Sequence, residues 1–291
     1  MNLSIPIWLA LAQMLWAGSY VAMKYALAEM PVAAVVFLRY GIVSVIFLTY
    51  WLFRRPPKFT LRDTLIMGGV GVLDFFLAQV LQVQALKFTQ AVDASILVVF
   101  EPLLTILLAA LVIRERPTRR TWIALPIGMV GMVLLSKGTM TLQAGINPLR
   151  LLGNLLFLLS LAGEATYSVA GKTYARRYGA IHSVAWMMIA GFLVGSIVNF
   201  PTISRISYST LSVRAWLSVL FLAVACSVFS YTLWYWVLKR AQVQQAALSL
   251  LLQPFFGALF GFALLGETIG AGTVLGGGLI ISSLVWWQVR S

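Results

Sequence analysis

Polar and aromatic side chains recur at helical spacing inside the long apolar stretches of this sequence. Gln13 and Trp16 are three residues apart, and Tyr20 and Lys24 follow at steps of four. Residues at such steps share one face of a helix. Amide, phenol and indole groups bind small molecules by hydrogen bonding and stacking. This face therefore indicates a binding surface.

Comparable polar faces are predicted in five further apolar segments, one of which carries Gln90, Asp93 and Glu101. Any single glutamine is equally well explained as a hydrogen bond between helices, so the interpretation depends on the repeated faces. Rings and amides with little net charge suit a zwitterion that has an apolar side chain. The candidate substrate-binding residues are Gln13, Trp16, Tyr20, Asp74, Gln79, Gln82, Glu164, Tyr167, Tyr231, Trp234, Gln245, Ser249 and Gln253.

Three carboxylates lie near the centres of apolar segments, at Asp74, Glu101 and Glu164. An isolated carboxylate is costly there and is expected to be protonated, paired or hydrated. All three are candidates for carrying a coupling proton. The alternative is a hydrogen-bonded acid or ion pair that fixes packing, for instance with Arg39.

Two prolines, Pro102 and Pro254, fall in the middle of predicted helices. Each removes a backbone hydrogen bond and favours a kink, so both are predicted hinges. By contrast, no nucleotide-binding loop, zinc motif or serine-centred triad is present, and His182 is the only histidine. We therefore expect no enzyme activity, no metal site and no cofactor. The single cysteine, Cys226, excludes an intramolecular disulfide.

The elements that carry these residues are predicted to be membrane-spanning helices. Hydrophobic residues make up 61% of the chain, charged residues 10%, and the mean hydropathy is +0.93. A water-facing surface could not carry this composition. The connections average about nine residues, which leaves no room for a soluble domain. The expected spans are 7–27, 32–53, 64–84, 91–113, 121–136, 149–173, 182–200, 214–237, 243–265 and 272–288.

The basic residues predict the orientation of the chain. Fourteen of them lie in connections on one side of the predicted bundle and five on the other. By the positive-inside rule, both termini are expected in the cytoplasm, and a bacterial inner membrane is the expected location. The first apolar run follows six residues without Lys or Arg and is expected to remain as a helix rather than a cleaved signal peptide. The net charge of +13 forms no continuous patch, so no nucleic acid partner is expected.

The two halves of the chain repeat each other. A shift of 152 residues aligns Pro102 with Pro254 and Glu115 with Glu267, and a shift of 148 aligns Lys24 with Lys172. Each unit holds five helices, an odd number, so the second unit is inverted relative to the first. The predicted fold is an all-α membrane protein with ten transmembrane helices, formed by residues 1–142 and 143–291 around a central cavity. The fifth and tenth helices lack polar faces and are expected at the periphery.

Several short segments resemble the drug/metabolite transporter superfamily with duplicated EamA units. They are Trp16-Ala17-Gly18-Ser19-Tyr20, Phe37-Leu38-Arg39-Tyr40, Glu101-Pro102, Arg114-Glu115-Arg116-Pro117 and Leu265-Gly266-Glu267-Thr268. The resemblance covers nearly the whole chain and implies a central substrate cavity and alternating access. Within the superfamily, the chain is most similar to bacterial aromatic amino-acid exporters. Met187 stands where the second unit would repeat Arg39, and Glu164 where relatives often have Trp, so substrate preference is expected to differ.

The sequence thus favours a secondary transporter that exports amino acids, aromatic or otherwise apolar, across the lipid bilayer. Export of drugs or other amphipathic metabolites is the alternative within transport. From a different class, a membrane scaffold or sensor would use the same polar faces for packing alone. The expected partner is a small-molecule substrate, and monomer and homodimer are both compatible with the sequence.

Overall fold

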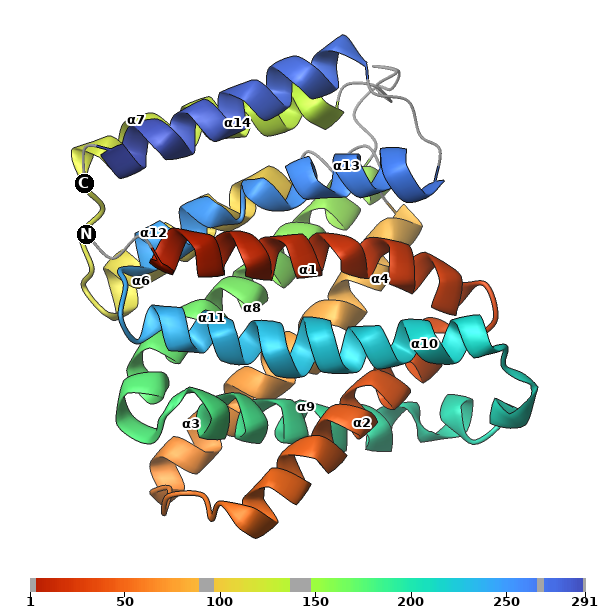
Figure 1. Ribbon diagram of the computed structural model, residues 1–291. Coiled ribbons are helices and arrows are strands. Elements are labelled where there is room, and N and C mark those ends of the chain that lie inside the picture. The colour runs from red at the N-terminus through yellow and green to blue at the C-terminus, as the bar shows by residue number, and fades with distance from the viewer. Residues whose placement is uncertain (1–3, 89–96, 137–147, 266–269, 290–291) are drawn as a thin grey trace.

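The protein is a bundle of helices that run roughly side by side (Figure 1). The computed structural model describes residues 4–88, 97–136, 148–265 and 270–289. In these ranges the chain crosses the bundle ten times, and both termini lie at one end, called the termini end below. In chain order the crossings are α1 (Ser4–Leu27); α2 (Val32–Phe53); α3 (Leu61–Val72), η1 (Leu73–Ala78) and α4 (Gln79–Phe88); η2 (Val98–Phe100) and α6 (Glu101–Val112); α7 (Arg119–Ser136); α8 (Pro148–Tyr178); α9 (Ala180–Ile203); α10 (Val213–Phe221), η5 (Leu222–Phe229) and α11 (Ser230–Leu238); α12 (Val243–Ser249) and α13 (Leu252–Leu265); and α14 (Ala271–Val289).

The predicted all-α fold with ten spans is confirmed. Among the described residues, seven helical stretches are long and apolar enough to cross a bilayer, and shorter apolar helices cover 98–112 and 271–287. Helices are the expected solution because lipid offers no partner to backbone N–H and C=O groups. α8 departs from its predicted bounds by continuing to Tyr178, five residues beyond its predicted end at 173.

Two crossings contain a π-helical segment that the sequence pattern does not reveal. The third crossing widens at η1 and the eighth at η5. Their first residues, Leu73 and Leu222, are 149 apart, close to the repeat shifts of 148 and 152. A π segment inserts extra backbone into a helix and is frequent at functional sites. The two repeats therefore place the same irregularity at the same depth.

The fourth and ninth crossings are interrupted rather than kinked. A 3₁₀ turn, η2, precedes α6, and a turn at Leu250–Leu251 separates α12 from α13. Pro102 and Pro254 lie in the first turn of α6 and α13, not inside continuous helices as the sequence suggested. The first turn tolerates proline because its N–H groups lack intrahelical partners there. The interruptions are again equivalent in the two repeats.

Helix contacts follow the same two-fold relation. α1 packs against α13 and against the α10–η5–α11 crossing, while α8 packs against α6 and against the η1–α4 part of the third crossing. α7 and α14 pack along each other at one edge of the bundle (Figure 1), as expected for the fifth and tenth helices. The largest buried core joins α2, α3, α8, α9 and α11. α1 and α8 are thus equivalent helices. α1 packs against the eighth and ninth crossings, in the second repeat, and α8 packs against the third and fourth crossings, in the first.

Glycines allow the closest contact between α3 and α9. A Cβ at Gly71 would lie 2.0 Å from the Met187 carbonyl oxygen, and one at Gly191 would lie 2.7 Å from the Gly71 oxygen. Gly195, one turn further along α9, also faces this contact, since a Cβ there would lie 3.2 Å from the Phe76 ring.

We predict that Gly71→Ala destabilises the protein by about 1–3 kcal/mol, since the added methyl group has no space beside the α9 backbone. Gly69→Ala is the matched control, because a Cβ there contacts nothing within 4 Å. In a helix it should be neutral or stabilising by up to about 1 kcal/mol. Thermal unfolding of both variants in detergent checks this, and equal midpoints would contradict it.

Candidate functional site

A cluster of aromatic rings surrounds Tyr231 on α11. Its ring centroid lies 5.0 Å from that of Trp16, 5.3 Å from Phe75 and 5.2 Å from Tyr167, all edge to face. Trp234 adds a contact of 5.3 Å to Trp16. The rings come from α1, η1, α8 and α11, so both repeats contribute. Trp16 and Tyr231 keep accessible surface, whereas Tyr167 and Trp234 are buried.

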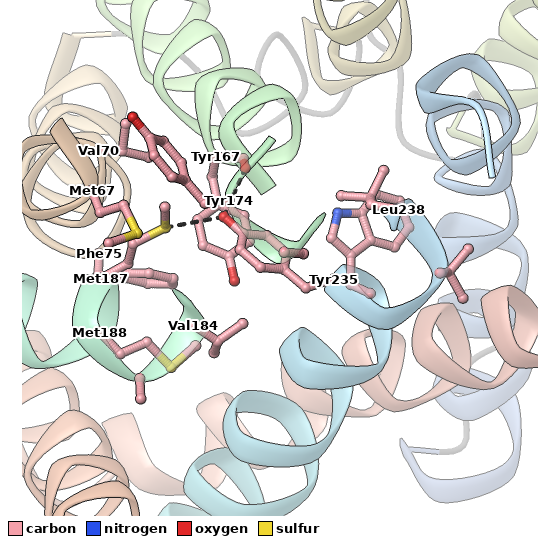
Figure 2. Packing of buried hydrophobic residues seen from close by; sticks show 14 of the residues in the cluster. Met67, Val70, Phe75, Tyr167, Tyr174, Val184, Met187, Met188, Tyr235 and Leu238 are labelled. Carbon is pink, nitrogen blue, oxygen red and sulfur yellow. Dashed lines mark hydrogen bonds between the residues drawn. The ribbon is translucent and has the colours of Figure 1, made fainter. Parts of the chain in front are cut away.

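Hydrogen bonds fix the buried rings of this cluster. The Trp234 indole donates to Ser168 Oγ at 3.2 Å. The Tyr235 hydroxyl donates to the Tyr167 carbonyl at 2.9 Å and approaches Met187 Sδ at 3.0 Å, as Figure 2 shows. Tyr235 was not among the predicted site residues. It follows Trp234 on α11, so its position on the neighbouring face gave no signal in the polar pattern.

Side-chain donors from α1 and from the eighth crossing itself bind carbonyls of η5. The Trp16 indole donates to the Cys226 carbonyl at 3.0 Å, and the Ser227 hydroxyl donates to the Leu222 carbonyl at 2.9 Å. Ser230 donates to the Ala225 carbonyl at 2.8 Å. Irregular backbone at membrane depth persists only where such partners exist. The indole N–H of Trp16 therefore stabilises η5, while the Trp16 ring contacts the aromatic cluster.

One guanidinium lies beside the rings. Arg39 on α2 donates from Nε to Ser227 Oγ at 2.7 Å, and its charged carbon lies 5.1 Å from the Tyr40 ring centroid. Arg39 also interacts electrostatically with Asp74 and Tyr231. The Arg39 guanidinium is thus held by Ser227, and Asp74 is close enough to interact with its charge. An arginine fork with one N–H engaged keeps further donors for a carboxylate ligand.

Three carboxylates face the same region from η1, α6 and α8. Asp74 interacts electrostatically with Glu164 and Glu101, and Glu101 with Glu164. Gln82 on α4 donates to Glu164 Oε1 at 2.5 Å. Asp74 is buried, while Glu101 and Glu164 keep accessible surface. Among the described residues, no group of three His, Cys, Asp or Glu side chains is arranged to hold a metal ion.

A second polar contact joins α1 to the ninth crossing. Gln13 Nε2 donates to Ser249 Oγ at 3.2 Å, and both residues are buried. The other amide atom, Gln13 Oε1, is buried without a partner among the described residues. Ser249 and Gln245 also line a pocket of about 220 Å³ between α1, α12 and α14.

The predicted residues thus separate into those inside the packing and those with accessible surface. Gln13, Asp74, Tyr167, Trp234 and Ser249 are buried. The side chain of Tyr20, and Gln90 and Asp93, lie outside what the structure describes. Accessible surface remains on Trp16, Gln79, Gln82, Glu101, Glu164, Tyr231, Gln245 and Gln253.

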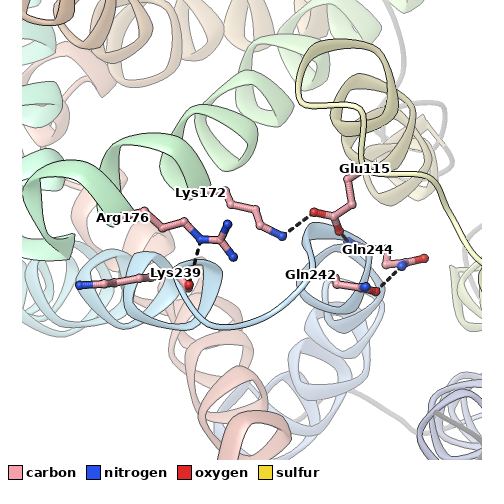
Figure 3. Close-up of polar contacts among 6 residues, drawn as sticks. All are labelled: Glu115, Lys172, Arg176, Lys239, Gln242 and Gln244. Carbon is pink, nitrogen blue, oxygen red and sulfur yellow. Dashed lines mark hydrogen bonds and ion pairs between the residues drawn. The ribbon is translucent and has the colours of Figure 1, made fainter.

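Polar contacts close the termini end between the two repeats (Figure 3). Lys172 at the end of α8 forms an ion pair of 2.5 Å with Glu115, which follows α6, and only 12% and 13% of the two side chains is exposed. Glu115 also accepts from the Gln244 backbone N–H at 3.4 Å, and Gln244 Oε1 accepts from Thr121 at 2.5 Å. Lys172 is paired because the fold brings Glu115 beside it.

A second ion pair at the same end joins Arg177 to Asp63 at 2.6 Å, and Tyr178 donates to the same carboxylate. The opposite end is held differently. There Glu29 accepts from the Ser212 N–H at 2.8 Å and from its hydroxyl. These two hydrogen bonds hold the pKa of Glu29 below its usual value.

Comparison with known proteins identifies the fold and class. A family model described as the EamA-like transporter family matches residues 3–137 and again residues 151–287. The chain belongs to the EamA-like transporter family. An uncharacterized transporter of Archaeoglobus fulgidus is 26% identical, covering 98% of this chain and 97% of its own length. The uncharacterized transporter YoaV of Bacillus subtilis is 24% identical and covers 92% of this chain and 90% of its own.

One crystal structure superposes with a TM-score of 0.83 at 18% sequence identity, covering 100% of this chain and 98% of its own, which supports the fold. This EamA-like protein is therefore a multi-pass membrane transporter and not an enzyme. The two family matches agree with the duplicated unit inferred from the repeats. The boundaries 1–142 and 143–291 stay a prediction.

We predict that Glu115→Gln opens the termini end. Loss of an ion pair worth about 1 kcal/mol shifts a two-state equilibrium about fivefold. A cysteine at Tyr231 in a Cys226→Ser background reports the change through its labelling rate by an impermeant maleimide applied at that end of oriented vesicles. Labelling should rise about fivefold. Lys239→Gln, which removes an exposed charge at the same end, is the control, and unchanged labelling in the Glu115 variant would rule out this closure.

Proposed function

We propose that this EamA-like transporter exports amino acids with aromatic or other apolar side chains from the cytoplasm by alternating access. The observation that carries the proposal is the surroundings of Tyr231. Its ring contacts Trp16 and Phe75, and it interacts electrostatically with both Arg39 and Glu164. A zwitterion with an aromatic side chain presents the complementary groups: a carboxylate, an ammonium group and a ring.

The proposed direction and location rest on charge. The fourteen basic residues that the sequence assigns to one side of the bundle favour a cytoplasmic position for that side in a bacterial inner membrane. The ion pair between Lys172 and Glu115 then closes the cytoplasmic side. We infer that the segments before Pro102 and Pro254 act as the hinges, because in both the helix tightens into a 3₁₀-type turn directly before the proline.

A second candidate is export of cationic amphipathic compounds. Three carboxylates at the site face a single guanidinium, so the site has an excess of acidic groups when all are ionised. Such a site, lined by rings, also suits an apolar cation. Competition by all twenty amino acids and by hydrophobic ammonium compounds against labelled tryptophan separates the two candidates.

We predict that purified protein in liposomes takes up labelled tryptophan or phenylalanine. Trp16→Ala and Tyr231→Ala should weaken apparent affinity about three- to tenfold, since one aromatic contact contributes about 0.5–1.5 kcal/mol. Gln253→Ala should also reduce transport. Leu217→Ala, at an outward-facing position of α10, is the control. Normal transport by all three site variants with intact folding would place the substrate elsewhere.

We also predict that one of Asp74, Glu101 and Glu164 couples transport to a proton gradient. The corresponding neutral variant, Asp74→Asn, Glu101→Gln or Glu164→Gln, should transport without responding to an imposed pH gradient, because its amide cannot exchange a proton. Initial rates with and without the gradient measure this. Retained dependence in all three variants would remove the carboxylates from the coupling step, and gradient-independent wild-type transport would indicate a facilitator.

A further inference from the structure

An apolar groove of about 570 Å³ lies on the bundle away from the aromatic site. α2 and the η5–α11 part of the eighth crossing form its walls, and Trp8 of α1 and Ile181 of α9 complete its lining. Its accessible lining is almost entirely apolar, and Val224 and Phe229 are 42% and 46% exposed. The groove is lined by Trp8, Ile46, Phe47, Tyr50, Ile181, Val224, Val228, Phe229, Thr232, Leu233 and Trp236.

The length of the groove matches one leaflet of a bilayer. From Val224 to Trp236 the helical rise amounts to roughly 15–18 Å. Half of a hydrocarbon core of about 30 Å is close to this length. Trp236 and Trp8 form an edge-to-face pair, with ring centroids 6.5 Å apart, where the groove reaches the termini end. Indole rings prefer the interface between hydrocarbon and headgroups, so the groove runs from that interface toward the midplane.

Positive charge gathers where the groove ends. Arg240 lies with its guanidinium carbon 3.9 Å from the Trp236 ring centroid, and its Nη1 donates to the Trp236 carbonyl at 3.0 Å. Lys239 is exposed beside it, and Arg54 is exposed one helical turn after Tyr50 of the opposite wall. Thr232, one turn deeper than Trp236, has a buried hydroxyl without a partner among the described residues.

We propose that this groove binds one anionic phospholipid from the leaflet at the termini end. One acyl chain lies along Val224 and Val228, and the phosphate contacts Arg240 with Lys239 or Arg54 nearby. Arg240 is held in place by Trp236, yet its fork keeps N–H donors for phosphate oxygens. A neutral lipid would fit the apolar walls but would leave the cations without an anion.

Native mass spectrometry of the full chain in detergent, with phosphatidylglycerol or phosphatidylcholine of equal chain length added, tests the proposal. We expect one phosphatidylglycerol to be retained in preference to phosphatidylcholine. Arg240→Gln should lower this preference about fivefold, since one cation near anionic lipid contributes about 1 kcal/mol. Arg205→Gln, which removes an exposed charge elsewhere, is its control. Val224→Trp should fill the deep end and abolish retention, whereas Leu217→Trp, at an outward-facing site on α10, should not.

Equal retention of both lipids by the wild-type chain would overturn the proposal, as would unchanged preference in Arg240→Gln. If the wild-type chain showed a doubled mass and Val224→Trp abolished it, the groove would be assigned to a second copy of the chain. Displacement of phosphatidylglycerol by free tryptophan would make it a path for substrate. Because Arg240 is exposed, its variant remains informative if Val224→Trp fails to fold.

Discussion

The structure depends on one constraint: in lipid, every backbone and side-chain polar group must find its partner inside the protein. Regular helices meet this requirement for most of the chain. At η5 the helix is irregular, and Trp16, Ser227 and Ser230 donate side-chain hydrogen bonds to its carbonyls. These side-chain hydrogen bonds therefore stabilise the π-helical backbone of η5. The aromatic site lies beside this segment.

Because the chain is duplicated, irregular helical segments occur at equivalent positions in both repeats. η1 and η5 widen equivalent helices, and the breaks before Pro102 and Pro254 interrupt equivalent helices. α1 and α8, the equivalent helices that begin the two repeats, both border these irregular segments. A site bordered by such irregular crossings has neighbouring backbone that can rearrange without first breaking long regular helices. The regular, peripheral pair α7 and α14 lies away from it.

The individual side chains depart from the symmetry that the backbone keeps. Arg39 has no counterpart in the second repeat, where Met187 instead lies beside the Tyr235 hydroxyl. Asp74, Glu101 and Glu164 bring acidic charge from η1, α6 and α8. The result is a site with a guanidinium and carboxylates around one set of rings. Chemical asymmetry within a symmetric frame permits a polar ligand to bind in one orientation.

The sequence by itself determined the ten spans, the inverted duplication and most of the polar faces, because hydropathy and helical periodicity follow directly from exclusion of water by lipid. Only the tertiary structure decided which residues on those faces meet. It buried Trp234 against Ser168, turned Trp16 toward η5 and paired Lys172 with Glu115, a residue 57 positions away. Neither π segment was visible either, since a single extra residue of backbone leaves the hydropathy of a span unchanged. Such contacts join distant segments, and periodicity along one helix carries no information about its neighbours.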